Sequence, residues 1–220
     1  MTTSAQPAPT TTSRQATVFV VDDDPAMRES LCWLIESIGL NARAFESAAA
    51  FLNAFDPAAP GCLVVDVRMP GMSGLELHTR LAEQAASLPV LIITGHGDVP
   101  MAVRAMKNGA FDFLEKPFND QALLERIGQA IEHDKKQRQA QQRDAQYQAR
   151  VQSLSPRERQ VLDMVVQARL NKQIAATLEL SEKTVETHRA NVMRKMGAVT
   201  VVELVRMVME HQMNLHNTST

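Results

Sequence analysis

Short apolar runs alternate with amphipathic helical patterns five times between residues 16 and 133, and this alternation limits the folds open to the chain. The runs suit buried strands, and the segments after them carry apolar residues at helical spacing. Strands that alternate with helices form a parallel sheet with helices on both faces. The sequence therefore predicts a five-stranded, doubly wound α/β domain over residues 16–133.

Polar residues mark where each predicted helix begins. Asp24 followed by Pro25 is typical of an N-cap with proline at the first helical position. Similar starts follow the other strands. We expect strands at 17–21, 41–45, 63–65, 89–94 and 111–114, with helices that begin at Asp24, Ser47, Ser73, Asp98 and Asn119.

Acidic residues gather where the predicted strands end. Right-handed crossovers place the ends of strands one, three, four and five at one edge of the sheet. Three carboxylates there repel each other unless a cation binds, and Mg²⁺ suits them because it prefers oxygen ligands. The edge receives Asp22, Asp23, Asp66, Thr94 and Lys116.

The residues at this edge predict phosphoryl chemistry at Asp66. An ammonium, a hydroxyl and a metal ion around one carboxylate form a cradle for phosphoryl oxygens. Asp66 would then act as a nucleophile and become an aspartyl phosphate. Each residue alone could equally be an ordinary polar residue of a loop, so the prediction depends on all of them lying together.

The charge is divided unevenly along the chain. Residues 16–133 hold 8 Lys and Arg against 16 Asp and Glu, whereas residues 134–220 hold 14 against 9. A basic second part suits polyanionic partners. Two cysteines are too few for a disulfide framework, and we expect no membrane span, no signal peptide and a cytoplasmic location.

The connector between the two parts is rich in Lys, Arg, Gln and Ala. Residues 132–152 contain no Gly or Pro, so we expect a long, largely exposed linker helix at 134–152. A flexible polar tether has the same composition and stays open as an alternative. Residues 1–15 and 216–220 are expected to be tails.

The second part, residues 153–215, has the pattern of four short helices. Ser155 and Pro156 begin the first, Asn171 begins the second, and Ser181 caps the third. Two short helices with a tight turn between them predict a helix-turn-helix within an all-α domain. A small helical bundle for protein contacts is the alternative on pattern alone.

The first part resembles a two-component receiver domain over its whole length. The resemblance implies a flavodoxin-like fold, a sensor histidine kinase as phosphodonor, and a Lys116-Pro117 bond in the cis form. The motifs that carry it are Asp22-Asp23, Asp66 to Gly74, Thr94 to Gly97, and Lys116-Pro117.

The same resemblance assigns roles within the pocket. Phe113 falls at the family's aromatic switch position, where Tyr is common, so a switch here would rest on packing alone. The other implied roles are Asp66 as phosphoacceptor; Asp23, Asp66 and the backbone carbonyl of Arg68 as Mg²⁺ ligands, with Asp22 acting through water; and Thr94 and Lys116 on the phosphoryl group.

The second part resembles the LuxR/FixJ-type DNA-binding domain in three segments: 154–159, 171–175 and 183–191. The resemblance implies that the third helix enters the major groove of promoter DNA, where Glu186 could accept from cytosine and Thr187 could meet a thymine methyl. The implied DNA-binding residues are Lys172, Lys183, Thr184, Glu186, Thr187, His188, Arg189, Ala190, Asn191, Arg194 and Lys195, of which some contact phosphates or frame the helix.

Together these features predict a LuxR/FixJ-type response regulator that controls transcription as a phosphorylation-dependent dimer. We expect RNA polymerase as a partner, activation of target promoters, and no catalysis beyond phosphoryl acceptance and hydrolysis at Asp66. Release of an inhibitory domain contact and dimerisation both remain open as the means of control. A phosphatase with an Asp nucleophile is a rival, but such enzymes commonly carry a second Asp where Arg68 stands. A regulator that responds to a partner instead of phosphate is a third possibility.

Overall fold

The structure, a computed structural model, describes residues 15–84, 87–95 and 99–217, and it divides into two compact units. The first unit is Met1–Arg138 and the second is Gln139–Thr220. The predicted tails at 1–15 and 216–220 lie largely outside the described residues, but positions 216 and 217 belong to the last helix and not to a tail. The elements that begin in the first unit are β1 Thr17–Val21, α1 Pro25–Ser37, β2 Asn41–Phe45, α2 Ala48–Ala54, β3 Gly61–Asp66, α3 Gly74–Glu83, β4 Val90–Thr94, α4 Val99–Lys107, β5 Asp112–Glu115 and α5 Asp120–Gln152.

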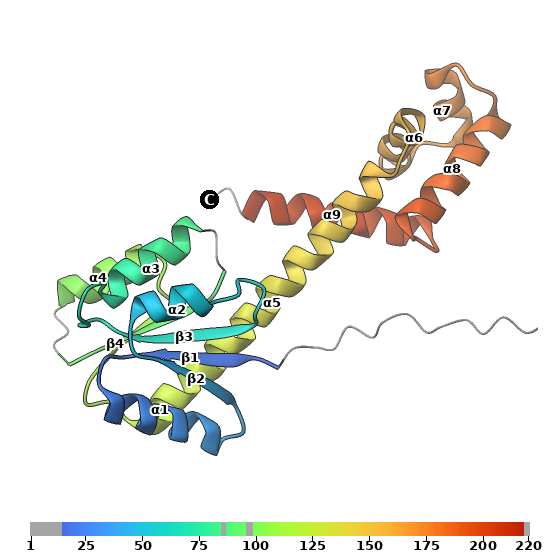
Figure 1. Ribbon diagram of the computed structural model, residues 1–220. Coiled ribbons are helices and arrows are strands. Elements are labelled where there is room, and N and C mark those ends of the chain that lie inside the picture. The colour runs from blue at the N-terminus through green and yellow to red at the C-terminus, as the bar shows by residue number, and fades with distance from the viewer. Residues whose placement is uncertain (1–14, 85–86, 96–98, 218–220) are drawn as a thin grey trace, which may run out of the picture. The chain divides into compact units, whose positions relative to one another are not determined.

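The first unit contains the predicted five-stranded parallel sheet (Figure 1). Its strand order is β2-β1-β3-β4-β5, and every neighbouring pair is parallel. Strand and helix bounds agree with the prediction to within a few residues. The carboxyl ends of β1, β3, β4 and β5 therefore lie at one edge of the sheet, as predicted.

Local sequence accounts for where these helices begin. Asp24 accepts the N–H of Ala26 at 2.9 Å, and Pro25 is the first residue of α1. Asn119 accepts the N–H of Gln121 at 2.8 Å and so caps α5. These side chains satisfy amide groups that have no partner within the helix. The predicted cap of α4, Asp98, lies outside the described residues.

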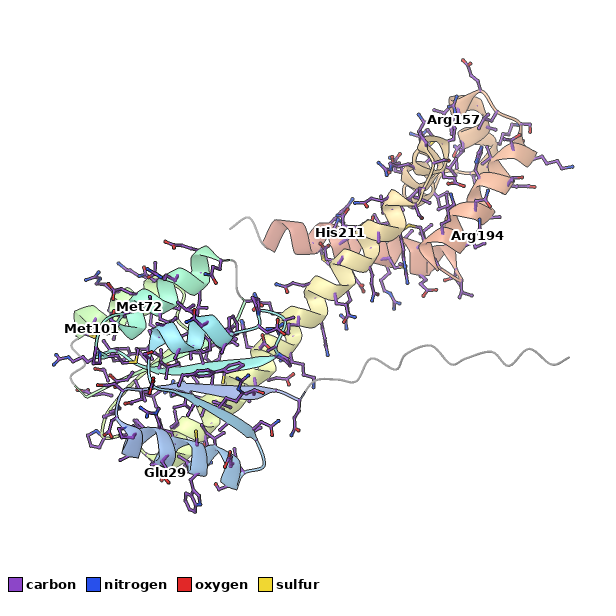
Figure 2. The ribbon with its side chains drawn as sticks, viewed as in Figure 1. Glu29, Met72, Met101, Arg157, Arg194 and His211 are labelled. Atoms are coloured by element: carbon purple, nitrogen blue, oxygen red, sulfur yellow. The ribbon has the colours of Figure 1, made fainter. Side chains whose placement is uncertain are left out.

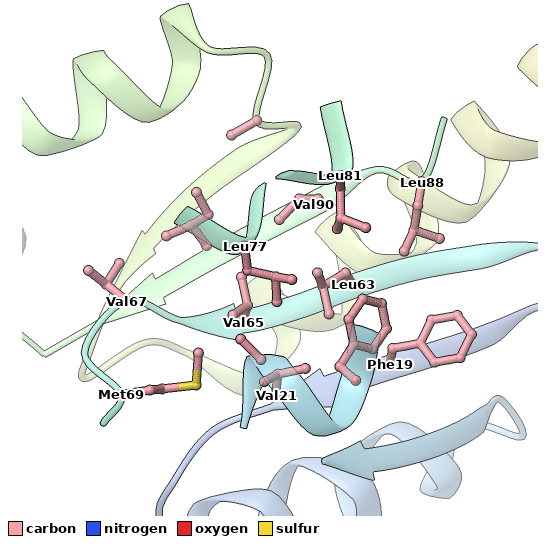
Figure 3. Close-up of a cluster of buried hydrophobic side chains, with 14 of the residues drawn as sticks. Phe19, Val21, Leu63, Val65, Val67, Met69, Leu77, Leu81, Leu88 and Val90 are labelled. Atoms are coloured by element: carbon pink, nitrogen blue, oxygen red, sulfur yellow. The ribbon is translucent and has the colours of Figure 1, made fainter. Parts of the chain in front are cut away.

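Two apolar layers cover the two faces of the sheet. Side chains from α2, α3 and α4 form one layer with alternate residues of β1 and β3, such as Phe19 and Leu63 (Figure 3). Side chains from α1 and α5 form the other layer with Val18, Cys62 and Val64. β3 is buried along its whole length, which explains why its sequence before Asp66 is continuously apolar and does not alternate.

A buried carboxylate anchors α5 beside the amino end of β3. Asp134 is 1% exposed, and its Oδ2 accepts a hydrogen bond from the Gly61 N–H at 3.0 Å. Arg138 Nε donates to both oxygens of the Asp134 carboxylate at 2.8 Å. Other Arg138 nitrogens donate to the carbonyls of Pro57 at 3.2 Å and Ala59 at 2.8 Å. This cluster fixes the first part of the connector to the loop that precedes β3.

The second unit contains the four predicted helices, together with the last turns of α5. The first of these helices begins with a capping box, in which the side chains of Ser155 and Glu158 each accept the other residue's backbone N–H. A single apolar core joins all of these helices. The bounds are α6 Pro156–Val166, α7 Asn171–Leu178, α8 Glu182–Met196 and α9 Val201–Asn217.

Candidate functional site

The strand ends bring an acidic pocket together in the first unit. Asp22 directly follows β1 and is 2% exposed, whereas Asp66 ends β3 and is 7% exposed. Thr94 ends β4 and is fully buried. Lys116 follows β5, and its backbone N–H donates to the carbonyl of Thr94 at 2.7 Å. The sheet thus places residues from four loops at one edge.

Lys116 joins the two buried carboxylates. Its Nζ lies 2.7 Å from Asp66 Oδ1 and 3.0 Å from Asp22 Oδ2. Burial alone would lower the pKa of Lys116, but hydrogen bonds to Asp66 and Asp22 outweigh burial and raise it. One ammonium facing two carboxylates leaves a net negative charge. The pocket therefore favours an added cation.

Backbone groups fix how the two carboxylates are turned. Asp66 Oδ2 accepts the N–H of Arg68 at 2.6 Å, which leaves Oδ1 toward Lys116. Asp22 Oδ1 accepts the N–H of Asp24 at 2.9 Å. The carbonyl of Asp22 also accepts a bond from Arg28 at 2.7 Å. Both acids are consequently oriented before any ligand arrives.

The loop after Asp66 returns closely past it. Gly74 begins α3, and its N–H donates to the carbonyl of Val67 at 3.1 Å. A Cβ at Gly74 would run into the backbone carbonyl of Asp66. The adjacent N-cap, Ser73, forms a capping box with Glu76. A residue without a side chain at position 74 therefore allows α3 to start against the end of β3.

The other predicted residues of this site differ in exposure. The side chains of Asp23 and Arg68 are exposed, although the Arg68 backbone N–H bonds Asp66, and Phe113 packs, half-buried, against the core. The Lys116–Pro117 bond is cis, as the resemblance implied. Residues 96 and 97 of the predicted Thr94 to Gly97 motif lie outside the described residues.

The donor set suits a hydrated Mg²⁺ ion more than a closed cage of side chains. Within the described parts of the chain, no group of three or more His, Cys, Asp or Glu side chains is arranged to hold a metal. Mg²⁺ commonly uses one or two carboxylates and keeps several waters. Asp22 and Asp66 provide two carboxylates with incomplete charge compensation, so the residues present fit this ion.

A cavity lies beside the pocket, between α1 and the loop that follows β5. It has a volume of about 490 Å³ and is lined by Met27, Leu34, Pro117 and Phe118, among others. Trp33, the chain's single tryptophan, also lines it and is 73% exposed.

In the second unit, α7 and α8 form the predicted helix-turn-helix. Glu179 adopts the left-handed conformation at the end of α7, with φ of 55°. Ser181 then caps α8 by accepting the N–H of Thr184 at 3.1 Å. Val185, Val192 and Met196 are buried, as predicted for the inward face of α8.

The outward face of α8 is polar and in large part exposed. On α8, Lys183, Glu186, Thr187, Ala190 and Arg194 are exposed, whereas Thr184, His188, Arg189, Asn191 and Lys195 are half-buried; Lys172, on α7, is also exposed. The two groups together are the full set of residues that the sequence assigned to DNA.

Several of these side chains have partners that sequence reasoning missed. Lys195 Nζ lies 2.6 Å from Glu158 and 3.0 Å from the carbonyl of Ser153. The hydrogen bond to Lys195 lowers the pKa of Glu158, and bonding to Ser155 adds to the effect. Arg189 donates to Asn171 Oδ1 at 2.8 Å. Nothing in the sequence distinguishes these cations from free ones, because their partners lie 18 to 42 residues away.

Two buried histidine nitrogens also lay outside the prediction. Nδ1 of His78 in α3 and Nδ1 of His188 in α8 lack a hydrogen-bond partner among the described residues. Burial lowers the pKa of His78, although a hydrogen bond to the Gly109 backbone opposes this. None of the described helices is both long and apolar enough to cross a membrane.

Comparison with known proteins agrees with this geometry. The family described as "Response regulator receiver domain" matches residues 18–128, and that described as "Bacterial regulatory proteins, luxR family" matches residues 152–208. The chain is 50% identical to "Transcriptional regulatory protein FixJ" of Azorhizobium caulinodans, over 87% of this chain and 91% of that protein. It is 49% identical to "Nodulation protein W" of Bradyrhizobium diazoefficiens, over 90% and 87% respectively.

Solved structures give the same result. The response regulator StyR superposes with a TM-score of 0.84 and 45% identity, covering 89% of this chain and 99% of that one. Full-length FixJ from B. japonicum gives a TM-score of 0.57 and 47% identity, covering 91% and 99%. The chain therefore belongs to the FixJ-type response regulators of the luxR family, transcriptional regulators that join a receiver domain to a LuxR-type DNA-binding domain.

Proposed function

We propose that this regulator is switched by a phosphoryl group that a sensor histidine kinase transfers to Asp66. The observation that supports this most is the placement of Lys116 Nζ within hydrogen-bonding distance of both Asp22 and Asp66. A carboxylate oxygen of Asp66 would attack the phosphorus as the bond to the donor breaks. Lys116 would then exchange its contact with Asp66 for the incoming phosphoryl oxygens.

Asp23, Asp66 and the backbone carbonyl of Arg68 would hold Mg²⁺, with Asp22 acting through water. The ion would supply positive charge for the phosphoryl oxygens. Because Asp22 and Asp66 are already oriented by backbone N–H groups, little reorganisation would be needed for binding.

Thr94 and Phe113 would report the modification. Thr94 would turn its hydroxyl to the phosphoryl group, and Phe113 would follow it inward. Phe113 lies opposite Ile92 of β4 and packs half-buried against the core, so a small shift of β4 can reach it. The repacked surface would form the phosphorylation-dependent homodimer.

The dimer would bind promoter DNA through α8. Glu186, Thr187, Ala190 and Arg189 are proposed to face the bases, and the first two are exposed on α8. The basic side chains would position the helix on the phosphates, except that Lys195, bonded to Glu158, would act by framing α8. The set that would contact phosphates or frame the helix is Lys172, Lys183, Thr184, His188, Asn191, Arg194 and Lys195.

The cellular setting follows from these partners. A chain that meets a kinase, promoter DNA and RNA polymerase would act in the cytoplasm, as an activator of transcription. It would turn over no substrate beyond its own aspartyl phosphate. We place the receiver domain at 16–133 and the DNA-binding domain at 153–215, with the linker helix at 134–152 between them.

Labelling tests the phosphoryl transfer. The protein is incubated with Mg²⁺ and acetyl phosphate, and its mass is measured before and after peptide digestion. We expect one phosphoryl group on Asp66 in the wild type and none in Asp66→Ala. Release of phosphate over many turnovers would favour the phosphatase, and an unlabelled wild type would favour a regulator that responds only to a partner.

Binding to DNA tests the second unit. Affinity for a duplex from a promoter near the regulator's own gene is measured at several salt concentrations. We expect the logarithm of the binding constant to fall linearly with the logarithm of salt concentration, because phosphate contacts release counterions. Lys183→Met should reduce the slope, whereas loss of Glu186 should change the preferred base sequence instead.

A further inference from the structure

The last turns of α5 are packed within the DNA-binding unit. The second compact unit begins at Gln139, before the end of α5, and Tyr147 and Val151 pack against its apolar core. Arg159 of α6 donates to the carbonyl of Val151 at 3.1 Å. The sequence predicted a largely exposed connector, and most residues of 134–152 are exposed, but the packing of Tyr147 and Val151 was not predicted.

Arg150 bonds the carboxyl end of α8. Its Nη1 donates to the carbonyl oxygen of Met196, the last residue of that helix, at 2.8 Å. The final carbonyls of a helix lack partners within it and carry partial negative charge. A guanidinium there both satisfies the oxygen and complements that charge.

The contact is reciprocal. Lys195, one residue before the end of α8, donates from Nζ to the carbonyl of Ser153 at 3.0 Å. Ser153 directly follows the end of α5. A cation of each helix therefore bonds a carbonyl at, or directly after, the end of the other helix. This arrangement fixes the direction of α8 against the end of α5.

Gly197 keeps room for Arg150. It adopts φ of +68° and ends α8, and its N–H bonds back to the carbonyls of Met193 and Arg194. A Cβ at Gly197 would lie 3.3 Å from Cζ of Arg150, which is closer than ordinary contact. The turn that ends α8 therefore matches the guanidinium in conformation and in space.

A second contact holds the same stretch of α5 against α9. The ring of His211, labelled in Figure 2, stacks on Tyr147 with centroids 4.2 Å apart. His211 Nδ1 bonds Asp144, and its Nε2 lies 3.0 Å from Gln148. Arg150 in the first contact, and the α5 and α9 residues of this second contact, all lie outside positions 152–208, the range that matches the luxR family.

We propose that Arg150 is a positioning residue for DNA recognition, acting through the carboxyl end of α8. The inference rests on the proposed binding of DNA by α8. It goes further in assigning to the linker helix a direct part in aiming the recognition helix. A turn of α5 about its own axis would carry Met196, and with it α8, because the two helix ends are bonded to each other.

Arg150→Met and Arg143→Met test this role in the full-length protein. Both residues lie on α5, two turns apart, and both line a cavity that Tyr147 also lines. Arg143 is exposed, however, whereas Arg150 is half-buried. Each change removes one positive charge, so any general weakening of DNA binding should be similar in the two. The probes are a duplex enriched by the wild type from a random-sequence library and an unrelated duplex of equal length.

We expect Arg150→Met to weaken binding to the enriched duplex about tenfold, as for loss of a charged hydrogen bond. Binding to the unrelated duplex should match that of Arg143→Met. Arg150→Lys, which can still reach a carbonyl oxygen, should restore most of the preference. Thermal unfolding of each variant verifies that the helices remain folded at the temperature of the binding assay.

Equal preference for the enriched duplex in Arg150→Met and Arg143→Met would overturn the inference while leaving the proposed function intact. A wild type that enriches no duplex would overturn both. Equal losses of affinity for the enriched duplex in Arg150→Lys and Arg150→Met would also count against the role, because the hydrogen bond that lysine can still form should preserve part of that affinity.

Discussion

The carboxylate of Asp134 accepts the backbone N–H of Gly61 at 3.0 Å, across 73 residues of sequence. Gly61 is the first residue of β3, and Asp134 lies in α5 well past the last strand. Arg138 compensates the buried charge with two hydrogen bonds of 2.8 Å. An acid on an apparently solvated helix thus satisfies the amide that opens the central strand.

Loss of Asp134 should destabilise the receiver domain. Asp134→Ala leaves the Gly61 N–H without its acceptor and Arg138 without its counter-charge, and we expect a loss of about 3 kcal/mol in the free energy of unfolding. Urea titration of the full-length protein measures this. Glu132→Ala, at an exposed site on the same helix, should change stability by less than about 0.5 kcal/mol. Similar losses in both variants would contradict the importance of the buried bond.

The buried imidazole of His78 should make the receiver domain sensitive to mild acid. Its pKa lies below the ordinary 6.5 because of burial, so the unfolded chain takes up the proton first as the pH falls. The stability that depends on neutral His78 is complete above the unfolded pKa and is lost as the pH falls below it. Urea midpoints compared at about pH 7.5 and about pH 5.5 should fall less in His78→Gln than in the wild type.

His133→Gln is the control for this pH dependence, since His133 is exposed. It should retain the full decrease seen in the wild type. If His78→Gln lost as much stability in acid as His133→Gln, the buried imidazole would not be the responsible group.

Removal of Lys116 should make the acidic pocket depend on divalent cations. Lys116→Met leaves the buried carboxylates of Asp22 and Asp66 facing each other without compensation, which we expect to cost about 1–3 kcal/mol. Added Mg²⁺ should then raise the Tm of the variant more than that of the wild type. Lys107→Met, at an exposed position on α4, should respond to Mg²⁺ like the wild type. An equal Tm shift in all three proteins would argue against cation binding in this pocket.

A methyl group at position 74 should disturb Asp66 itself. Because a Cβ there meets the Asp66 carbonyl, Gly74→Ala should destabilise the protein by about 1–3 kcal/mol and slow labelling by acetyl phosphate. Gly128→Ala has open space around its Cβ in α5 and should stabilise by about 0.5–1 kcal/mol. Chemical unfolding and a labelling time course give the two readouts. Unchanged labelling in Gly74→Ala would show that the close approach has no effect on the acid.

The main fold and the pocket could be predicted because their signals are local. Each apolar run ends at a polar residue. Parallel pairing then brings Asp22, Asp66 and Lys116 to one edge of the sheet, and this placement does not depend on the conformation of the connecting loops. Caps such as Asp24 and Ser181 likewise depend only on residues within one turn.

The remaining features depend on distant contacts that leave no periodic signal. Asp134 stands among charged neighbours, so its pattern is that of an exposed helical face, and its burial depends on contacts with Gly61 and Arg138 that the pattern does not show. Asp144 and His211 are 67 residues apart. The packed end of the linker, and the engagement of Lys195 by Glu158, therefore required the folded structure.

The exposed indole of Trp33 gives the molecule an intrinsic optical probe. Since the chain has one tryptophan, nearly all near-ultraviolet emission comes from a single place on α1, next to the cavity that Lys116 also lines. A change of fluorescence on addition of Mg²⁺ or acetyl phosphate would therefore report this surface alone. Spectroscopy could follow events beside the pocket without attaching a dye.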